Sequence, residues 1–468
     1  MLFNSADFLL FLPIVFAIYW LLNKKRRLQN LFVVAASYLF YGWWDWRFLI
    51  LIAFTSALSW LSGLMIGRRP KLWLWISVVV NLAILGLFKY YDFFAAELAQ
   101  LLGLQADRLL LHLVLPVGIS FYTFQALSYT IDVYKHRIEP TRDAAAFFAY
   151  VSFFPQLVAG PIERATNLLP QFLKQRRFDY TQAVDGMRQM LWGFFLKMAV
   201  ADGCGIYVDR VWDSYATASP EQLITAAILF SIQIFGDFAG YSNIAIGCAK
   251  LFGISLRQNF RTPYFSRDIA EFWRRWHISL TTWFRDYLYI PLGGSRVSKI
   301  KVVRNTFIIF LVSGLWHGAN WTFLAWGAFH ALLFLPLILS GRNRRNLGEV
   351  AGGRILPTLK ELGQMLLTFV LCTIGWLLFR APSIEEALAF SSIIFKGNSG
   401  IDGLSLPVTT MLFIIAMAIF EWLNRNKEYG LAIDSVRSRA LRIIIYYAIF
   451  ACTLLFSISG RSFIYFQF

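Results

Sequence analysis

The chain has 468 residues, of which 58% are hydrophobic and 15% are charged. Soluble proteins average about 45–50% apolar and about 25% charged residues, so this composition nearly excludes the water-soluble classes. Lys and Arg outnumber Asp and Glu by 44 to 27, for a formal net charge of +17. On a soluble chain that excess would indicate nucleic-acid binding, whereas on a membrane protein it indicates basic loops facing an anionic cytoplasmic surface.

Apolar runs recur along the whole sequence, and each predicts a helix. A helix needs about 20 residues to cross the ~30 Å hydrocarbon core, and shorter runs can serve with interfacial aromatics or local thinning. The runs lie roughly at 8–22, 31–44, 48–66, 72–90, 109–127, 143–159, 187–202, 222–256, 306–339, 362–379, 408–423 and 441–458. They predict an all-α fold, a polytopic integral membrane helical bundle with interfacial and re-entrant helices. The run at 143–159, interrupted by Gly160-Pro161, is expected to dip into the membrane and return.

Basic clusters between the runs predict the topology. Such clusters stand at 24–27, 68–71, 135–137, 174–177, 342–345 and 425–427, and the intervening loops are mildly acidic. Because basic loops stay in the cytoplasm, both termini are predicted to be non-cytoplasmic. The excess positive charge then lies in loops on the cytoplasmic side of the membrane, and no nucleic-acid partner is expected. We expect one membrane domain over residues 1–468.

The segment 257–304 is predicted to be a cytoplasmic, basic and interfacial part of that domain. It holds ten Lys or Arg residues and three acids. Its apolar residues between Ile269 and Leu288 recur at helical spacing, which predicts a basic amphipathic helix in the interface. His277 joins the apolar row and should point into the protein. From position alone it is more simply an interfacial histidine satisfied by a neighbour than a functional one.

The segment 306–339 is predicted to form the helices that carry a functional histidine. Its first apolar stretch runs from Thr306 to Trp316 and breaks at His317-Gly318-Ala319-Asn320. Eleven helical residues rise only ~16 Å, which would put His317 near the bilayer midplane. An ionisable group there suggests function, and an imidazole can take a proton from a hydroxyl; a histidine hydrogen-bonded between helices is the alternative. Gly314 and Gly318 would permit close approach of another backbone or a ligand.

Three further ionisable groups lie in apolar runs. Asp237 could orient a histidine or pair with Lys197, and a structural ion pair is the favoured role. His330 lies about 220° around the helix from His317 and is expected to serve packing.

Other signatures are missing from the sequence. The four cysteines are far apart and no CxxC occurs, so neither a metal site nor a disulfide framework is expected. A Walker A loop, a G-x-S-x-G elbow and an H-E-x-x-H motif are also absent. Any chemistry is therefore expected within the helical bundle.

Five ordered sequence blocks resemble the membrane-bound O-acyltransferase superfamily, specifically its bacterial alginate O-acetyltransferase branch. The blocks lie at 154–162, 237–247, 272–280, 285–294 and 314–322, and they include Trp273-Arg274-Arg275-Trp276-His277 and Gly314-Leu315-Trp316-His317-Gly318. The resemblance runs from Phe3-Asn4-Ser5 to Phe463-Ile464-Tyr465-Phe466.

This resemblance implies an O-acetyltransferase of the bacterial cytoplasmic (inner) membrane. It implies that acetyl moves from a cytoplasmic donor across the membrane for O-acetylation of an exported, alginate-like polysaccharide. The donor is expected to be acetyl-CoA, with no bound cofactor, and exported acetyltransferase or acyl-relay proteins are the implied partners. The family's catalytic histidine corresponds to His317 and its second motif histidine to His277.

The expected mechanism combines the positions of the two histidines in the sequence with the roles that the resemblance implies for them. His317 would deprotonate an acceptor hydroxyl, and His277 would help to orient donor or acceptor. Donor-binding residues are expected to be Arg274, Arg275, Arg285, Trp316 and Asn320, since guanidinium groups suit the phosphates of CoA.

Other functions are compatible with the same sequence. The same fold could perform D-alanyl or peptidoglycan acyl transfer. A non-enzymatic polysaccharide transporter or a scaffold is the alternative from a different class, and neither would need the histidine at the predicted midplane.

Overall fold

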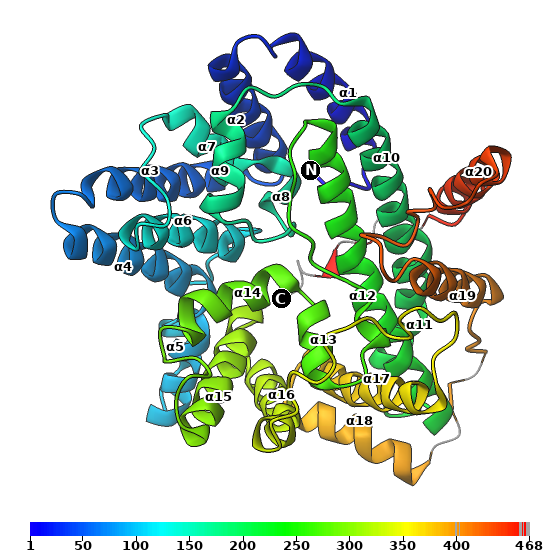
Figure 1. Cartoon of the computed structure of the whole chain (residues 1–468). Coiled ribbons are helices and arrows are strands. Elements are labelled where there is room, and N and C mark those ends of the chain that lie inside the picture. Colours follow the sequence, from blue (N-terminus) through cyan, green and yellow to red (C-terminus); the bar gives the residue numbers. More distant parts are fainter. Residues whose placement is uncertain (398–399, 402, 458–460, 462, 465–468) are drawn as a thin grey trace. The chain divides into compact units, whose positions relative to one another are not determined.

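The structure is a computed structural model that describes residues 1–397, 400–401, 403–457, 461 and 463–464 (Figure 1). These residues form helices and loops, with no strand among them. Within the described part of the chain, six helices are long and apolar enough to cross a membrane: 46–65, 70–89, 180–213, 220–251, 321–339 and 359–380. The all-α, multi-pass prediction is therefore confirmed. Tyr465 and Phe466 of the last matching block lie outside the described residues.

The chain forms two compact units. Unit 1 comprises residues 1–187 and 244–257, and unit 2 comprises 188–243 and 258–468. Two long helices, α10 (Tyr180–Phe194) and α12 (Pro220–Leu251), contribute to both. This division does not test the single domain expected over 1–468, which stays a prediction.

Unit 1 is built around α6 (Ile119–Tyr134), whose residues are almost all buried. The other helices of this unit are α1 (Ala6–Leu21), α2 (Arg26–Gly42), α3 (Leu49–Met65), α4 (Pro70–Lys89), α5 (Tyr91–Leu102), α7 (Ala144–Ser152), α8 (Phe154–Leu157) and α9 (Ala165–Leu173). A helix buried on every side must satisfy its polar side chains internally. Thr130 accordingly shares a 2.9 Å hydrogen bond with Ser77 of α4.

The predicted helix at 109–127 is wrong in its bounds. The helix begins at Ile119, because the residues before it include Pro116 and Gly118, the latter at φ +75°. A Cβ on Gly118 would lie 2.7 Å from the carbonyl oxygen of Leu157, so this turn also needs the close approach that glycine allows. The run at 143–159 divides into α7 and α8, and nine residues of α7 rise only about 14 Å, too few to cross a bilayer.

Unit 2 contains every histidine of the predicted site. Its remaining helices are α11 (Asp202–Asp213), α13 (Ile269–Arg275), α14 (Ile278–Phe284), α15 (Lys299–His317), α16 (Trp321–Leu339), α17 (Leu359–Arg380), α18 (Ile384–Lys396), α19 (Val408–Leu423) and α20 (Arg439–Leu455). π-helical turns follow α10 at Phe195–Ala201 and α14 at Arg285–Tyr289. Helices α15 and α16 lie side by side as a hairpin (Figure 1).

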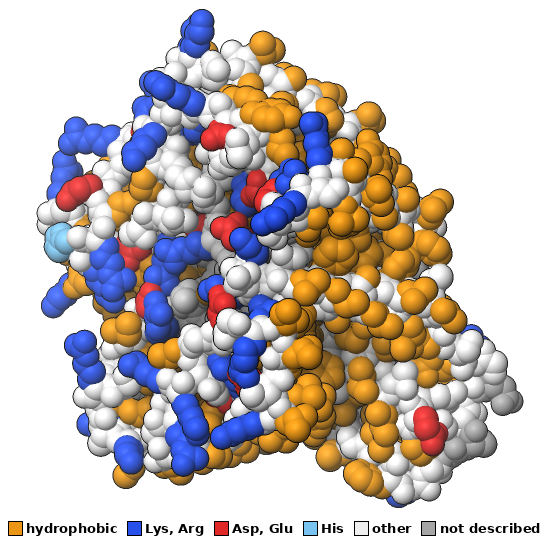
Figure 2. Space-filling model, turned by 45° about the vertical axis from the view of Figure 1, so that its right-hand side comes forward, with side chains coloured by type: hydrophobic (Ala, Val, Ile, Leu, Met, Phe, Trp, Pro, Cys, Tyr) orange, Lys and Arg blue, Asp and Glu red, His pale blue; other side chains and the backbone are white. Residues whose placement is uncertain are grey.

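Charged and apolar side chains occupy different areas of the face drawn in Figure 2. Lys and Arg side chains lie together there, with Asp and Glu among them, and apolar side chains cover broad areas. Large side chains of the spanning helices point outward, for example Ile50 (68% exposed), Trp75 (62%) and Leu366 (57%). Such a surface is costly in water and favourable against lipid, in agreement with the multi-pass prediction.

Candidate active site

The α15–α16 hairpin positions His317. Helix α15 ends at His317, and Asn320 caps α16 by accepting the N–H of Thr322 (3.0 Å). The helices approach closely at two glycines: a Cβ on Gly314 would lie 2.2 Å from the carbonyl oxygen of Phe323, and one on Gly327 would lie 2.3 Å from that of Phe310. The close approach predicted at Gly314 is confirmed. Because α15 begins at Lys299, it is longer than the apolar run, and the depth of His317 in a bilayer stays a prediction.

Aromatic side chains enclose His317, which is only 6% exposed. Its ring centroid lies 4.9 Å from that of Trp316, 5.2 Å from that of Trp326 and 5.2 Å from that of Phe379. These residues come from both arms of the hairpin and from α17. An imidazole held in such a dry enclosure can exchange a proton with a reacting hydroxyl with little competition from water.

His277 lies at a break between α13 and α14, and the predicted continuous amphipathic helix is wrong at this point. It has a left-handed backbone (φ 43°, ψ 52°), which is uncommon for a residue with a side chain. The break is held from outside the helix, since the N–H of Ile278 donates to the carbonyl of Asn259 (2.9 Å) and that of Arg261 to the carbonyl of Arg275 (3.0 Å).

The structure brings His277 and His317 to the same aromatic cluster. His277 is 1% exposed, as its place in the apolar row predicted, and burial lowers its pKa to about 3, so the imidazole is neutral at pH 7. Its ring lies 5.9 Å from the Trp316 ring, which is in turn 4.9 Å from that of His317. Phe238 packs edge-on against the other side of His277 at 4.7 Å. Trp316 therefore separates the two predicted site histidines.

His330 is part of the same cluster but has a packing environment. It is fully buried, accepts a long hydrogen bond from the Trp273 indole (3.4 Å) and packs against Trp326 at 5.0 Å. This arrangement agrees with the packing role expected for it.

Unlike the two histidines, the residues predicted to bind the donor are not gathered in one cluster. Arg274 donates to the carbonyls of Asn343 and Asn346, and Arg275 donates to the Glu271 carboxylate at 2.8 Å. Arg285 pairs with the neighbouring Asp286 (2.6 Å). Trp316 belongs to the histidine cluster, and the Asn320 amide donates to the carbonyl of Pro382 (2.8 Å). The structure thus brings only Trp316 and Asn320 to the hairpin of His317.

The ion pair favoured for Asp237 is confirmed. Its carboxylate lies 2.6 Å from the Lys197 ammonium, and the same ammonium lies 2.8 Å from Asp202. Asp237 precedes Phe238 in the chain, so the ion pair and the wall of the His277 site share one turn of α12.

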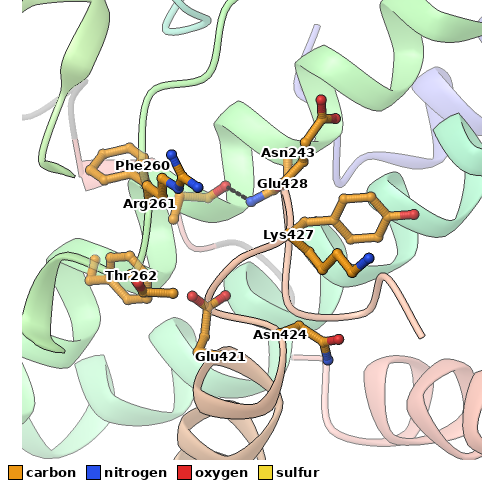
Figure 3. A pocket seen from close by; sticks show the side chains of 11 residues that line it. Asn243, Phe260, Arg261, Thr262, Glu421, Asn424, Lys427 and Glu428 are labelled. Atoms are coloured by element: carbon orange, nitrogen blue, oxygen red, sulfur yellow. Dashed lines mark hydrogen bonds between the residues drawn. The ribbon is translucent and has the colours of Figure 1, made fainter. Parts of the chain in front are cut away.

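A small polar pocket with a cavity volume of about 10 Å³, room for about one water molecule, lies next to the aromatic cluster (Figure 3). It is lined by Phe235, Ala239, Asn243, Phe260, Arg261, Thr262, Glu421, Asn424, Lys427, Glu428 and Tyr429. Figure 3 shows Arg261 and Phe260 on one side, Lys427 on the other, and the Glu421 carboxylate pointing between them. The Phe260 ring packs against Phe238 at 4.8 Å. Two aromatic side chains, Phe260 and Phe238, therefore connect this pocket to His277.

The sequence does not indicate the combination of residues that lines the pocket. In the sequence, Arg261 and Lys427 belong to separate basic clusters, 166 positions apart in the numbering. The one available signal was their charge, and nothing in their spacing indicates that they meet.

Comparisons with known proteins bear on the same residues. The profile of the membrane-bound O-acyltransferase family matches residues 140–350, which include His277 and His317. The probable alginate O-acetylase AlgI of Pseudomonas aeruginosa is 40% identical over 406 residues, 85% of this chain and 75% of that protein. The probable alginate O-acetylase AlgI of Pseudomonas putida is 35% identical over the whole of both chains. The peptidoglycan O-acetyltransferase of Helicobacter pylori is 33% identical over 87% of this chain and 81% of that protein. The chain therefore belongs to the membrane-bound O-acyltransferase family and is a multi-pass membrane acyltransferase.

Proposed function

We propose that this acyltransferase takes acetyl from acetyl-CoA at the cytoplasmic side of the bacterial inner membrane and supplies it for O-acetylation of an exported, alginate-like polysaccharide. The observation that carries the proposal is the enclosure of His317 at the break of the α15–α16 hairpin, with His277 beyond Trp316. The two alginate O-acetylases named above support the acetyl group and the acceptor class.

In the proposed step, His317 acts as general base. It takes the proton of an acceptor hydroxyl while the hydroxyl oxygen attacks the thioester carbonyl. The new C–O bond forms, the C–S bond breaks, and the CoA thiolate leaves and takes up the proton from protonated His317. Neutral His277 helps to orient the reactants across Trp316 rather than carrying charge.

The phosphates of the donor are assigned to Arg261 and Lys427. Among the basic residues of 257–304, Arg274 and Arg275 donate to protein groups. Arg261 makes a longer ion pair with Glu349 (3.6 Å), and its side chain is 47% exposed. Phe260 gives the pocket an apolar wall, and Glu421, held by the Trp192 indole at 3.1 Å, offers an acceptor for an amide N–H of the pantetheine arm. Anionic phosphates suit the two cations.

The topology proposed with this function follows from the positive-inside rule. The clusters at 24–27, 68–71, 342–345 and 425–427 stay cytoplasmic, and both termini lie outside the cytoplasm. Lys427 then faces the compartment that holds acetyl-CoA. Exported acetyltransferase or acyl-relay proteins would carry acetyl onward to the polysaccharide.

Reversing the donor-site charges is expected to weaken donor binding selectively. In purified Arg261→Glu and Lys427→Glu proteins, we expect the KM for acetyl-CoA to rise by about 10-fold, with kcat changed much less, because each reversal replaces an attraction to phosphate by a repulsion. CoA release from radiolabelled acetyl-CoA measures both constants. Lys360→Glu is the matched control, since Lys360 is an exposed cation of unit 2 that does not line the pocket. An unchanged KM in both variants would contradict the assigned donor site.

A second acceptor is favoured by one observation. The Helicobacter pylori relative is a peptidoglycan O-acetyltransferase, so peptidoglycan is the alternative acceptor for the same chemistry. Measuring ester-linked acetate on both polymers from the same cells distinguishes the two.

A further inference from the structure

A buried ion triad connects the π-helical turn Phe195–Ala201 and the start of α11 with α12, near His277. Lys197 lies between Asp202 (2.8 Å) and Asp237 (2.6 Å), and the three side chains are at most 7% exposed. Ionised groups within apolar spanning helices are costly, and an ion pair between buried groups often adds little net stability. The triad therefore calls for an explanation beyond stability alone.

The backbone around the triad is built for close approach. Lys197 lies in the π-helical turn Phe195–Ala201, a conformation that is frequent at functional sites. Gly236 and Gly240 flank Asp237 on α12, and a Cβ on Gly240 would lie only 2.8 Å from the carbonyl oxygen of Gly193. The glycines thus let α12 contact the turn that carries Lys197.

The triad also holds a segment from near the end of the sequence. The second oxygen of Asp237, Oδ2, accepts the N–H of Ile464 at 2.6 Å. Arg461, three residues earlier, pairs with Asp209 of α11 at 3.0 Å. Phe463 is 3% and Ile464 is 4% exposed, so these described residues are packed into unit 2 rather than lying on its surface.

The same segment reaches the aromatic wall of the His277 site. The Phe463 ring lies 4.7 Å from that of Tyr241 and 6.4 Å from that of Phe238. Phe238 packs edge-on against His277 (interplanar angle 88°). The ion triad, Phe463, Phe238 and His277 therefore form one continuous set of contacts.

We propose that Lys197, Asp202 and Asp237 are positioning residues that dock Phe463 and Ile464 against α12 and thereby fix Phe238 against His277. This rests on the proposed function, because the role of the positioning is to keep His277 in place for acyl transfer. The Asp237 carboxylate accepts the Ile464 N–H with one oxygen and pairs with Lys197 through the other, so the buried charges and the docking depend on each other. Loosening the segment should lower kcat and leave donor binding, at the pocket lined by Arg261 and Lys427, nearly unchanged.

The test reads docking and turnover separately. Ile464→Cys, made together with Cys452→Ser, puts a thiol at a buried docked position, and the other cysteines, Cys204, Cys248 and Cys372, are buried. In this background we compare Asp237→Asn, Asp237→Glu and Arg461→Ala. The last removes only a partly exposed ion pair and should not impair folding. Docking is read as the rate at which maleimide labels the introduced thiol, and turnover is CoA release from acetyl-CoA.

Asp237→Asn and Arg461→Ala should each speed labelling by about 10-fold and lower kcat by a similar factor, with the KM for acetyl-CoA nearly unchanged. Asp237→Glu keeps the charge, so its labelling rate and its kcat should each lie between those of Asp237→Asn and those of the protein with Asp237 unchanged. The matched control is Asp185→Asn, which breaks another ion pair between α10 and α12 (Asp185–Lys250, 2.5 Å) and should change neither.

Two outcomes would overturn the proposal: faster labelling with unchanged kcat, or lower kcat with unchanged labelling. Loss of the proposed function itself has a different signature, because it appears as CoA release that survives His317→Ala, whatever the labelling rate of the introduced thiol.

Discussion

Replacing His317 with alanine is expected to lower CoA release from acetyl-CoA by about 10²- to 10⁴-fold, the usual contribution of a general base. The imidazole is the group enclosed by Trp316, Trp326 and Phe379 at the break of the hairpin. The variant should still fold, because the hairpin is held by the glycine contacts and by the Asn320 cap rather than by the imidazole. Purified protein, matched in amount and checked by thermal unfolding, provides the measurement.

His330→Phe is the matched control for this variant. His330 contacts Trp326, as His317 does, and is fully buried. A ring-for-ring replacement keeps most of its packing, so we expect a rate within about threefold of that of the unchanged protein. If His317→Ala kept the full rate, His317 would not be the base. If His330→Phe lost as much as His317→Ala, the effect would belong to the aromatic cluster and not to one imidazole.

Replacing Gly314 with leucine is expected to prevent correct assembly of the α15–α16 hairpin. The added Cβ would lie 2.2 Å from the carbonyl oxygen of Phe323, a backbone atom that cannot move aside without shifting α16. Overpacking of this kind costs about 1–3 kcal/mol and sometimes more. We therefore expect a clear fall in the thermal unfolding temperature and in the yield of monodisperse protein, together with loss of acyl transfer.

Gly86→Leu provides the comparison for the hairpin variant. Gly86 lies in the spanning helix α4, and a Cβ there would meet nothing within 4 Å. Its unfolding temperature should remain close to that of the unchanged protein. Equal stability of Gly314→Leu and Gly86→Leu would mean that the hairpin does not need the close approach described above.

Several features of the site could be predicted because they depend on short-range pattern. Helical runs follow from hydropathy, and the hairpin break follows from His317-Gly318 within an apolar stretch. The pairing of Lys197 with Asp237 could be predicted for a different reason, because ionisable groups in apolar helices need partners.

Other features depend on contacts between distant segments and could not be predicted. The apolar residues of 269–288 keep helical spacing across the break, so the periodicity hides the left-handed backbone of His277. The break is fixed by backbone hydrogen bonds of Ile278 with Asn259 and of Arg275 with Arg261. The same holds for the pocket, where residues 260–262 meet residues 421–429. By contrast, the late start of α6 was readable from Pro116 and Gly118.

The central claim is that this chain supplies acetyl for polysaccharide O-acetylation through His317. It is tested most directly by the acetyl content of alginate from an alginate-producing bacterium that lacks its own O-acetylase and expresses either this chain or its His317→Ala variant at equal membrane levels. The proposed function predicts ester-linked acetate on the alginate with the unchanged chain and background levels with the variant. Acetylated alginate with both proteins would contradict the role of His317, and unacetylated alginate with both would contradict the proposed acceptor.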